Sequence, residues 1–282
     1  MSKNLLHRLK NNVNRFARRF GLELVTFESG FQEGLYPYSS RPVTPRYVNI
    51  GAGDFFHPFW HNLDMPNAYY ENSLRGKEYI IHDLTSDQPL PFESHSLHVV
   101  YCSHVIEHLS DMNVKSLFSE IFRCLGQGGY FRATCPDTDL YFRAYRENDY
   151  SFWKYPNAYG RDDNTIEQKF LGHFATRLTS AHPDRSSLKV LDDEIRSVFQ
   201  SLPVEEALDY FISKLPTETV QRYHADHVNW FNLSKLTRML RYAGFTDVYE
   251  SRFLQSRCAQ LRDPKLFDRT CPELSLYIEC RK

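Results

Sequence analysis

The stretch YVNIGAGDFF, residues 47–56, begins as an apolar run and continues into a Gly-x-Gly turn. Such a glycine pair after a strand is typical of a nucleotide-binding loop, because glycine lets the backbone approach a ligand closely. The dinucleotide fingerprint has a third glycine three residues further on, where this sequence has Phe56. The loop therefore predicts a nucleotide-like ligand that is not a dinucleotide.

Short apolar segments continue the pattern after this loop. We expect strands at HNLD (61–64), EYIIHDL (78–84), LHVVYCSHVI (97–106) and GQGGYFRATCP (126–136), with a helix at about 113–125. Strands interleaved with crossovers predict a parallel α/β sheet, in which ligands bind beyond the carboxyl ends of the strands. Polar residues stand at those ends: Asp54, Asp64, Asp83, Asp137 and Ser103.

The first crossover is unusually short. Only ten residues separate Gly53 from Asp64, and they include Pro58 and Trp60. A parallel crossover usually takes a dozen or more residues and a helix, so this helix should be very short or missing. A pyrophosphate binds at the N-terminus of that helix, and the loop therefore predicts a nucleoside ligand without phosphates. The carboxylate of Asp64 offers two acceptor oxygens, which suit the two ribose hydroxyls.

Composition excludes several classes of protein. The chain has 282 residues and a formal net charge of −1, which gives no global attraction to nucleic acid. The six cysteines contain no C-x-x-C pair, which argues against a zinc ribbon or a thioredoxin motif. Cys102 and Cys280 fall in expected strands, and we expect reduced, buried thiols in a cytoplasmic protein.

The N-terminal segment is basic, and its apolar residues recur at helical spacing. It lacks the apolar region of a secretory signal, and no apolar run in the chain is long enough to span a bilayer. Residues 1–20 therefore predict a basic amphipathic helix. Two interpretations stay open: docking on the inner membrane surface or an acidic partner, and packing on the helix's own domain.

Five segments in order resemble class I S-adenosylmethionine-dependent methyltransferases. They are NIGAGD, LPFESHSLHVVYCSHVIEHL (90–109), EIFRCLGQGGYFRATCPD (120–137), HVNWFNLSKLTRMLRYAGFTDV (227–248) and LRDPKLFDRTCPELSLYIECRK (261–282). The sequence is most similar to a bacterial subgroup associated with surface-polysaccharide biosynthesis. The resemblance implies a Rossmann-like, mostly parallel seven-stranded sheet with a C-terminal antiparallel strand. It also implies S-adenosylmethionine as cofactor.

The sequence departs from the family pattern at three positions. Asn49 stands where the family usually has an acid at the head of the glycine motif, and it can accept a hydrogen bond without neutralising a charge. Phe56 replaces the third glycine, and Gln127 replaces a usual proline in the turn before the fifth strand.

The extent of the resemblance suggests four parts of the chain. We expect an N-terminal helix and linker (1–45), a cofactor-binding core (46–137), a helical insertion that caps the substrate site (138–226) and the C-terminal part of the core (227–282). A segment between the fifth strand and the late helix would lie over the pocket mouth, where loops carry specificity. The other interpretation is a helical subdomain without direct contact to the ligand.

The resemblance assigns candidate roles to individual residues. Cofactor binding is expected from Asn49, Gly51, Gly53, Asp64, Asp83, Leu84, Ser103 and His104. Catalysis is expected from His227 or His224 as the general base and from Asp137 on the acceptor side. His104 and His108 are spaced to share a metal on a helix, but the sequence shows no third ligand, and we expect no metal.

The expected function is methyl transfer to an oxygen or nitrogen of a small-molecule or saccharide acceptor. Two alternatives stay open. A non-catalytic binding protein could keep the fold, since Asn49 weakens the glycine motif. An NAD-dependent oxidoreductase is disfavoured by the glycine pattern and by the short crossover.

Overall fold

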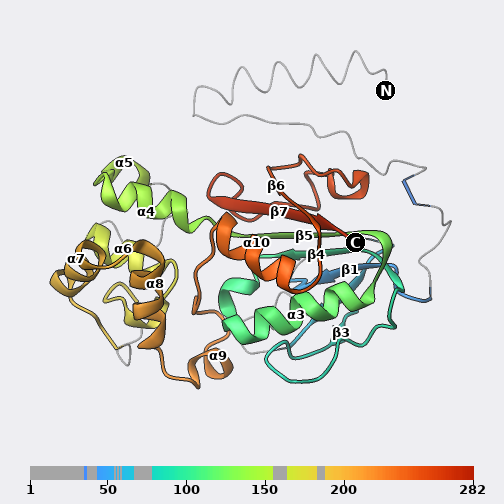
Figure 1. The fold of residues 1–282 in the computed structure, drawn as a ribbon, viewed down its shortest axis with the longest axis horizontal. Coiled ribbons are helices and arrows are strands. Elements are labelled where there is room, and N and C mark those ends of the chain that lie inside the picture. The colour runs from blue at the N-terminus through green and yellow to red at the C-terminus, as the bar shows by residue number, and fades with distance from the viewer. Residues whose placement is uncertain are drawn as a thin grey trace, which may run out of the picture.

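The computed structural model describes residues 35–36, 43–53, 55, 57, 59–66, 78–154, 164–182 and 188–282 (Figure 1). The predicted N-terminal helix of residues 1–20 lies outside the described residues, as do Asp54 and Phe56. Within the described residues, no helix is both long and apolar enough to cross a membrane.

A seven-stranded sheet forms the centre of the protein, with strand order β3-β2-β1-β4-β5-β7-β6. The five N-terminal strands are parallel: β1 (Tyr47–Ile50), β2 (His61–Asp64), β3 (Ile80–Ile81), β4 (Leu97–Ser103) and β5 (Leu125–Pro136). Strand β7 (Ser275–Arg281) runs antiparallel between β5 and β6 (Asp247–Ser251). The predicted mostly parallel sheet with one C-terminal antiparallel strand is confirmed.

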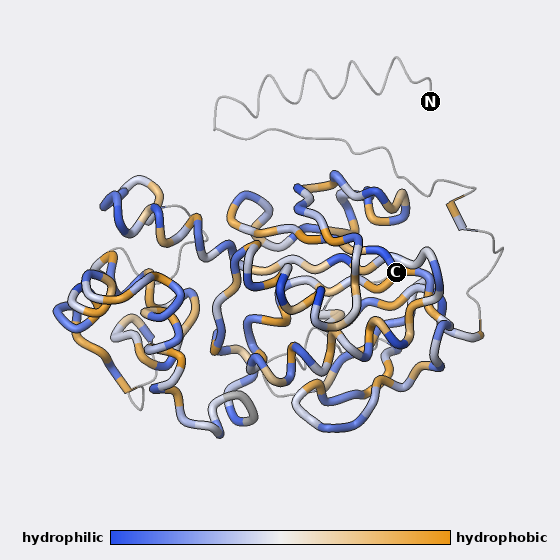
Figure 2. The backbone as a smooth tube through the Cα atoms, viewed as in Figure 1, coloured by the Kyte–Doolittle hydropathy of each residue, from blue (hydrophilic) through white to orange (hydrophobic). Residues whose placement is uncertain are grey.

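Helices α3 (Asp111–Cys124) and α10 (Leu233–Tyr242) lie together on one face of the sheet (Figure 1). The hydroxyl of Ser110 accepts from the N–H of Asn113 and caps α3, and Asn232 caps α10 in the same way. Apolar and polar residues alternate along both helices (Figure 2). Their apolar sides pack with Val100 and other buried strand residues in the largest hydrophobic cluster.

On the opposite face of the sheet, the described residues of the first crossover include no helix. The described residues between β1 and β2 consist of turns and irregular backbone, in agreement with the predicted short crossover. Because strand residues alternate between faces, Val99 and Tyr101 point away from the helix-covered side. They pack there against Phe55, Trp60 and Phe267, so aromatic rings occupy the place of a helix.

The described residues between 138 and 226 are mainly helical, as predicted. Their described elements are α4 (Thr138–Arg146), α5 (Tyr150–Trp153), α6 (Ile166–Gly172), η3 (Thr176–Leu178), α7 (Asp192–Ser201), α8 (Val204–Ser213) and α9 (Thr219–Arg222). Helices α4 to α8 lie beyond one end of the sheet (Figure 1) and have a hydrophobic cluster of their own around Phe170 and Phe211. The boundaries of the four proposed parts stay predictions.

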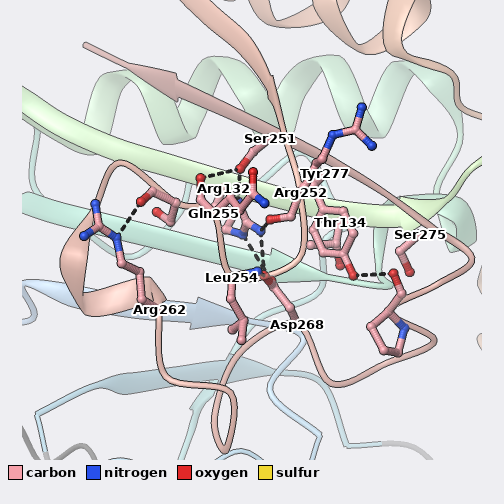
Figure 3. Close-up of polar contacts among 12 residues, drawn as sticks. Arg132, Thr134, Ser251, Arg252, Leu254, Gln255, Arg262, Asp268, Ser275 and Tyr277 are labelled. Atoms are coloured by element: carbon pink, nitrogen blue, oxygen red, sulfur yellow. Dashed lines mark hydrogen bonds and ion pairs between the residues drawn. The ribbon is translucent and has the colours of Figure 1, made fainter.

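Arg132 anchors the C-terminal connection between β6 and β7 (Figure 3). Its side chain is 0% exposed, and all five of its N–H donors are used. They bind the carboxylates of Asp268 and Glu279, the hydroxyl of Ser251 and the carbonyl of Arg252. We call Arg132, Asp268 and Glu279 the arginine cluster. It fixes the loop that leads into β7.

Four predicted elements have other bounds in the structure, and for the fifth strand the difference is only that it begins at Leu125. The third strand is limited to Ile80–Ile81, the helix begins at Asp111, and the fourth strand ends at Ser103 rather than continuing to residue 106. Strand β4 ends there because His104 has a φ of 54°, which is incompatible with extended backbone. The short η2 helix (Ile106–His108) follows β4.

All six cysteines are free thiols, and Cys102 and Cys280 lie in strands as expected.

Candidate active site

A cavity of about 510 Å³ lies beyond the carboxyl ends of four neighbouring strands. This volume is in the range of small-molecule and cofactor sites. Strands β3, β2, β1 and β4 lead into it through Asp83, Asp64, Gly51 and Ser103. Further lining residues come from the η2 region, from the segment before α10 and from the C-terminal loop: His108, Leu109, His224, Leu266, Arg269 and Thr270.

The two loop glycines are required for different reasons. Gly51 has a φ of +69°, and a Cβ atom there would lie 2.1 Å from Cγ2 of Val105. Any side chain at Gly51 would therefore collide with the segment after β4. Gly53 has a φ of +51° and open space where a Cβ would be. The left-handed backbone at Gly53 leaves the cavity wall free of side-chain atoms.

Asp64 holds the glycine loop and still faces the cavity. Its Oδ2 accepts from the N–H of Gly53 at 3.0 Å, and its Oδ1 accepts from the N–H of Met65 at 2.7 Å. A carboxylate oxygen has two lone pairs, so each oxygen can accept one further hydrogen bond. The two oxygens can thus receive a pair of ligand hydroxyls without releasing the loop.

Asn49 presents an unsatisfied acceptor at the cavity. Its side chain is 3% exposed and lines the cavity, and its Oδ1 has no hydrogen-bond partner among the described residues. A buried polar atom without a partner is costly, unless a ligand supplies one. Asn49 therefore fits a ligand with an N–H donor, such as an amino group.

The remaining predicted cofactor residues also line the cavity. The Oδ1 of Asp83 accepts from the N–H of Thr85 at 2.8 Å and from its hydroxyl at 2.7 Å, which shapes the turn after β3 beside Leu84. The hydroxyls of Ser103 and Thr134 are 2.8 Å apart. His104 Nε2 lies 2.8 Å from the Ser275 hydroxyl. The predicted set is thus gathered at one cavity, and its binding role stays a prediction.

A group of ionisable side chains surrounds the β4 end of the cavity. Glu107 is buried, with Oε1 lying 3.1 Å from His104 Nδ1. Burial opposes ionisation of Glu107, but His104, His108 and His227 outweigh it and hold its pKa below the ordinary value. The rings of His108 and His227 are 4.9 Å apart. Burial, aided by His108, lowers the pKa of His227 to about 4, so its imidazole is neutral at pH 7.

The predicted catalytic residues do not share one location. His224 lines the cavity, whereas His227 and Asp137 are not among its lining residues. Asp137 caps α4, and its Oδ1 accepts from the N–H groups of Asp139 and Leu140. The expected acceptor site between Asp137 and the histidines stays a prediction, and Asp137 would have to serve it in addition to capping α4. Among described residues of the insertion 138–226, only His224 lines the cavity.

The sequence did not reveal how Glu107, His108 and His227 combine. The spacing of His104 and His108 would place them on one face only in a helix, but the backbone of His104 has a left-handed conformation and His108 lies in η2. His227, 119 residues after His108, supplies the partner that the sequence spacing lacked. The C-terminal cavity residues Leu266 and Arg269 were also missed, since their loop has no periodic signal.

Comparison with known proteins adds family information. Residues 63–133 match the protein family described as "Methyltransferase domain". Among curated proteins, none matches this chain.

Solved structures share low sequence identity with the chain. A SAM-dependent methyltransferase from Thermotoga maritima, described as a possible histamine N-methyltransferase, is 13% identical, with 84% of this chain and 82% of that chain covered and a TM-score of 0.41. A methyltransferase from Mesorhizobium loti is 14% identical, with 88% and 94% covered and a TM-score of 0.41. A SAM-dependent methyltransferase from Archaeoglobus fulgidus is 14% identical. The match covers 97% of this chain and 94% of that chain, with a TM-score of 0.40.

The matched segment runs from β2 to β5 and contains five of the predicted cofactor positions, Asp64, Asp83, Leu84, Ser103 and His104. It also contains Glu107 and His108. The match to the methyltransferase domain family is limited to residues 63–133.

Proposed function

We propose that the protein transfers a methyl group from S-adenosylmethionine to an oxygen or nitrogen of a small-molecule or saccharide acceptor. The observation that carries this proposal is the cavity at the strand ends, where Asn49 Oδ1 and the Asp64 carboxylate offer acceptor atoms. A nucleoside that carries an amino acid has donors of both kinds, hydroxyl and amino. These residues therefore fit the cofactor of the matched family.

The cofactor half of the cavity follows the order of the strands. Asp64 would accept the two ribose hydroxyls, and the Asp83–Leu84 turn after β3 would lie beside the adenine. Asn49, with Ser103 at the end of β4, would contact the amino-acid part. Gly51 and Gly53 keep the loop free of side-chain atoms that would occupy this space.

The acceptor half is formed by the η2 region, His224 and the C-terminal loop. S-adenosylmethionine, when bound, supplies a sulfonium-linked methyl group that is already a good electrophile. The protein has to align the acceptor with this group and exclude water. The attacking oxygen or nitrogen forms the new bond to the methyl carbon while the carbon–sulfur bond breaks. We propose that His224 takes the acceptor's proton.

Three finer statements rest on the sequence alone. They are a saccharide acceptor with a role in surface-polysaccharide biosynthesis, the docking of residues 1–20 on a membrane surface or a protein partner, and the four-part division of the chain. Arg269 and Thr270 give the cavity a polar wall, which is compatible with a hydroxyl-rich acceptor.

Calorimetric titrations with S-adenosylhomocysteine, S-adenosylmethionine and NAD test the proposal. We expect both adenosyl ligands to bind and NAD to give no signal. Asp64→Ala should weaken S-adenosylhomocysteine binding by about 2–4 kcal/mol, because a charged acceptor of two hydroxyls is lost. The matched control is Asp87→Ala, at an exposed acid that does not line the cavity.

Each alternative has its own signature in this experiment. NAD binding without a response to the adenosyl ligands would favour an oxidoreductase and end the proposal. Adenosyl binding without methyl transfer to any of a panel of hydroxyl and amine acceptors would favour a non-catalytic binding protein. Unchanged affinity in a folded Asp64→Ala variant would assign the ribose to another residue.

A further inference from the structure

Glu107, His108 and His227 bring three metal-ligating side chains together. One ligand atom from each of them lies within 4.8 Å of the other two. The three come from distant parts of the chain, the η2 region after β4 and the segment before α10. We call them the histidine cluster. The catalytic proposal above uses none of them.

Backbone carbonyls fix both imidazole rings of this cluster. His108 Nδ1 lies 3.0 Å from the carbonyl oxygen of Asp226, and His227 Nδ1 lies 2.7 Å from that of His173. A carbonyl only accepts, so each Nδ1 carries the hydrogen and donates it. The lone pair of each neutral ring is then on Nε2. This Nδ1–H···O=C arrangement is the one that orients metal-bound histidines in proteins.

The carboxylate of Glu107 lacks the partners that its burial demands. The residue is 1% exposed, and neither of its oxygens has a hydrogen bond of good geometry among the described residues. The contact with His104 Nδ1 reaches Oε1 only. An ionised carboxylate out of water is costly unless it is paired or coordinates a metal. Beyond this one contact with His104, both oxygens of Glu107 have acceptor capacity that a bound cation would satisfy.

We propose that Glu107, His108 and His227 form a binding site for a divalent first-row transition metal ion at the wall of the cavity. Two imidazoles and a carboxylate suit Zn²⁺, Mn²⁺, Fe²⁺ or Co²⁺, whereas Mg²⁺ and Ca²⁺ prefer oxygen ligands alone. Three protein ligands leave coordination positions open, as in catalytic rather than structural sites. His108 lines the cavity, so these positions can be reached from it.

The role of the ion rests on the proposed function, although its binding does not. An acceptor oxygen bound to the ion would be polarised and held at the β4 end of the cavity, and it would lose its proton more readily. The ion would thus favour hydroxyl acceptors, above all those with two neighbouring oxygens. His224 would remain the residue that receives the proton.

Zn²⁺ and Co²⁺ titrations test the site directly. The full chain is treated with a chelator, exchanged into metal-free buffer and titrated with Zn²⁺ in a calorimeter and with Co²⁺ by visible absorption. We expect one ion per chain and a higher melting temperature with Zn²⁺, because the ion binds the folded state. Glu107→Gln and His108→Asn should each weaken binding by about 100-fold or more.

Two controls address ordinary surface binding. His224→Asn removes a cavity histidine outside the cluster, and Cys271→Ser removes the one thiol that the structure shows as only partly buried. Both variants should bind Zn²⁺ like the unaltered chain. Far-ultraviolet circular dichroism checks folding, and His108→Asn serves if Glu107→Gln does not fold.

The outcomes separate this inference from the proposed methyl transfer. Equal Zn²⁺ affinity in the unaltered chain and in folded Glu107→Gln, or no binding at all, would overturn the site and leave a protonated His104 as the partner of Glu107. Metal binding is measured without cofactor or acceptor, and S-adenosylhomocysteine binding is measured with chelator present. Failure of one therefore leaves the result of the other intact.

Discussion

The protein has two buried clusters of charged side chains, the arginine cluster around Arg132 in β5 and the histidine cluster around Glu107 after β4. They differ in how many of their polar atoms have hydrogen-bond partners. In the arginine cluster, all five Arg132 donors are used, and Asp268 and Glu279 accept further bonds from Tyr101, Leu254, Tyr249 and Arg257. In the histidine cluster, Glu107 is equally buried, but its oxygens lack well-aligned donors. One cluster is complete within the described residues, and the other has open acceptors.

This difference separates a structural ion pair from a candidate site. A fully paired buried cluster fixes one arrangement of the chain, here the loop that carries Leu266 and Arg269 to the cavity. A buried carboxylate with open oxygens gains little for stability, and it is retained where a ligand can complete it.

The largest effect is expected from Arg132→Met. This change leaves Asp268 and Glu279 buried without their cation, and we expect the free energy of unfolding to fall by about 3–5 kcal/mol. Urea unfolding followed by circular dichroism measures it. In the matched triple variant Arg132→Met, Asp268→Leu, Glu279→Met no charge is left buried, so most of the loss should be recovered. A single variant that loses less than about 1 kcal/mol would show that the cluster does not hold the loop.

The same isosteric change should act differently in the two clusters. Glu279→Gln replaces one accepting oxygen by a donor among Arg132, Tyr249 and Arg257, and should cost about 2–3 kcal/mol of stability. Glu107→Gln removes a buried charge whose one ion-pair contact among the described residues is His104, and with chelator present it should cost about 1 kcal/mol or less. Urea unfolding of both variants decides the point. Equal losses would mean that Glu107 is also a structural partner.

Local patterns explain why much of the fold could be predicted. The apolar run before Gly51 and the acids after the second and third strands depend on neighbouring residues and on the edge that parallel strands share. Asp64 and Asp83 therefore appear at the cavity as expected. The short crossover follows from counting residues between Gly53 and Asp64.

The histidine cluster could not be predicted because it depends on tertiary contacts. The role of Asp137 could not be predicted because one residue type suits both a helix cap and a ligand site. Glu107 meets His227 only because the segment before α10 packs on η2, and spacing along the chain does not encode that contact. Asp137 stands at a strand end like Asp64, but it is also the first acceptor available to α4. The residue pattern is compatible with both roles, and the structure shows the hydrogen bonds of the cap.

Acid sensitivity provides a test on an ordinary buried imidazole outside both clusters. Burial lowers the pKa of His57 to about 4, against about 6.5 in the unfolded chain. The unfolded state therefore binds the proton first, and the stabilisation present above about pH 6.5 is lost as the pH falls toward 4. His57→Asn keeps an acceptor for the Phe59 N–H and removes this titration.

Because the His57 ring keeps some solvent contact, the expected difference is about 1–2 kcal/mol rather than the full shift. Urea unfolding at pH 7 and pH 4.5 should show a smaller loss for His57→Asn than for the unaltered chain. An identical pH dependence would assign the acid sensitivity to other histidines.

The smallest effect is expected at Asp137, whose carboxylate is satisfied by the backbone rather than open like that of Glu107. Asp137→Ala should lower the free energy of unfolding by about 1 kcal/mol, since the cap of α4 is lost, whereas Asp137→Asn keeps a capping oxygen.

The pH dependence of stability gives a second measurement on the same residue. Burial raises the pKa of Asp137, so the folded state keeps its proton to higher pH than the unfolded state does. Stability therefore falls as the pH rises above the pKa of the unfolded chain, near 3.9. Asp137→Asn lacks this charge and should be at least as stable as the unaltered chain at pH 7. Thermal unfolding of the three proteins at pH 4 and pH 7 measures both points. If Asp137→Ala instead keeps full stability and abolishes methyl transfer, the carboxylate serves the acceptor, and position at the end of β5 outweighs capping.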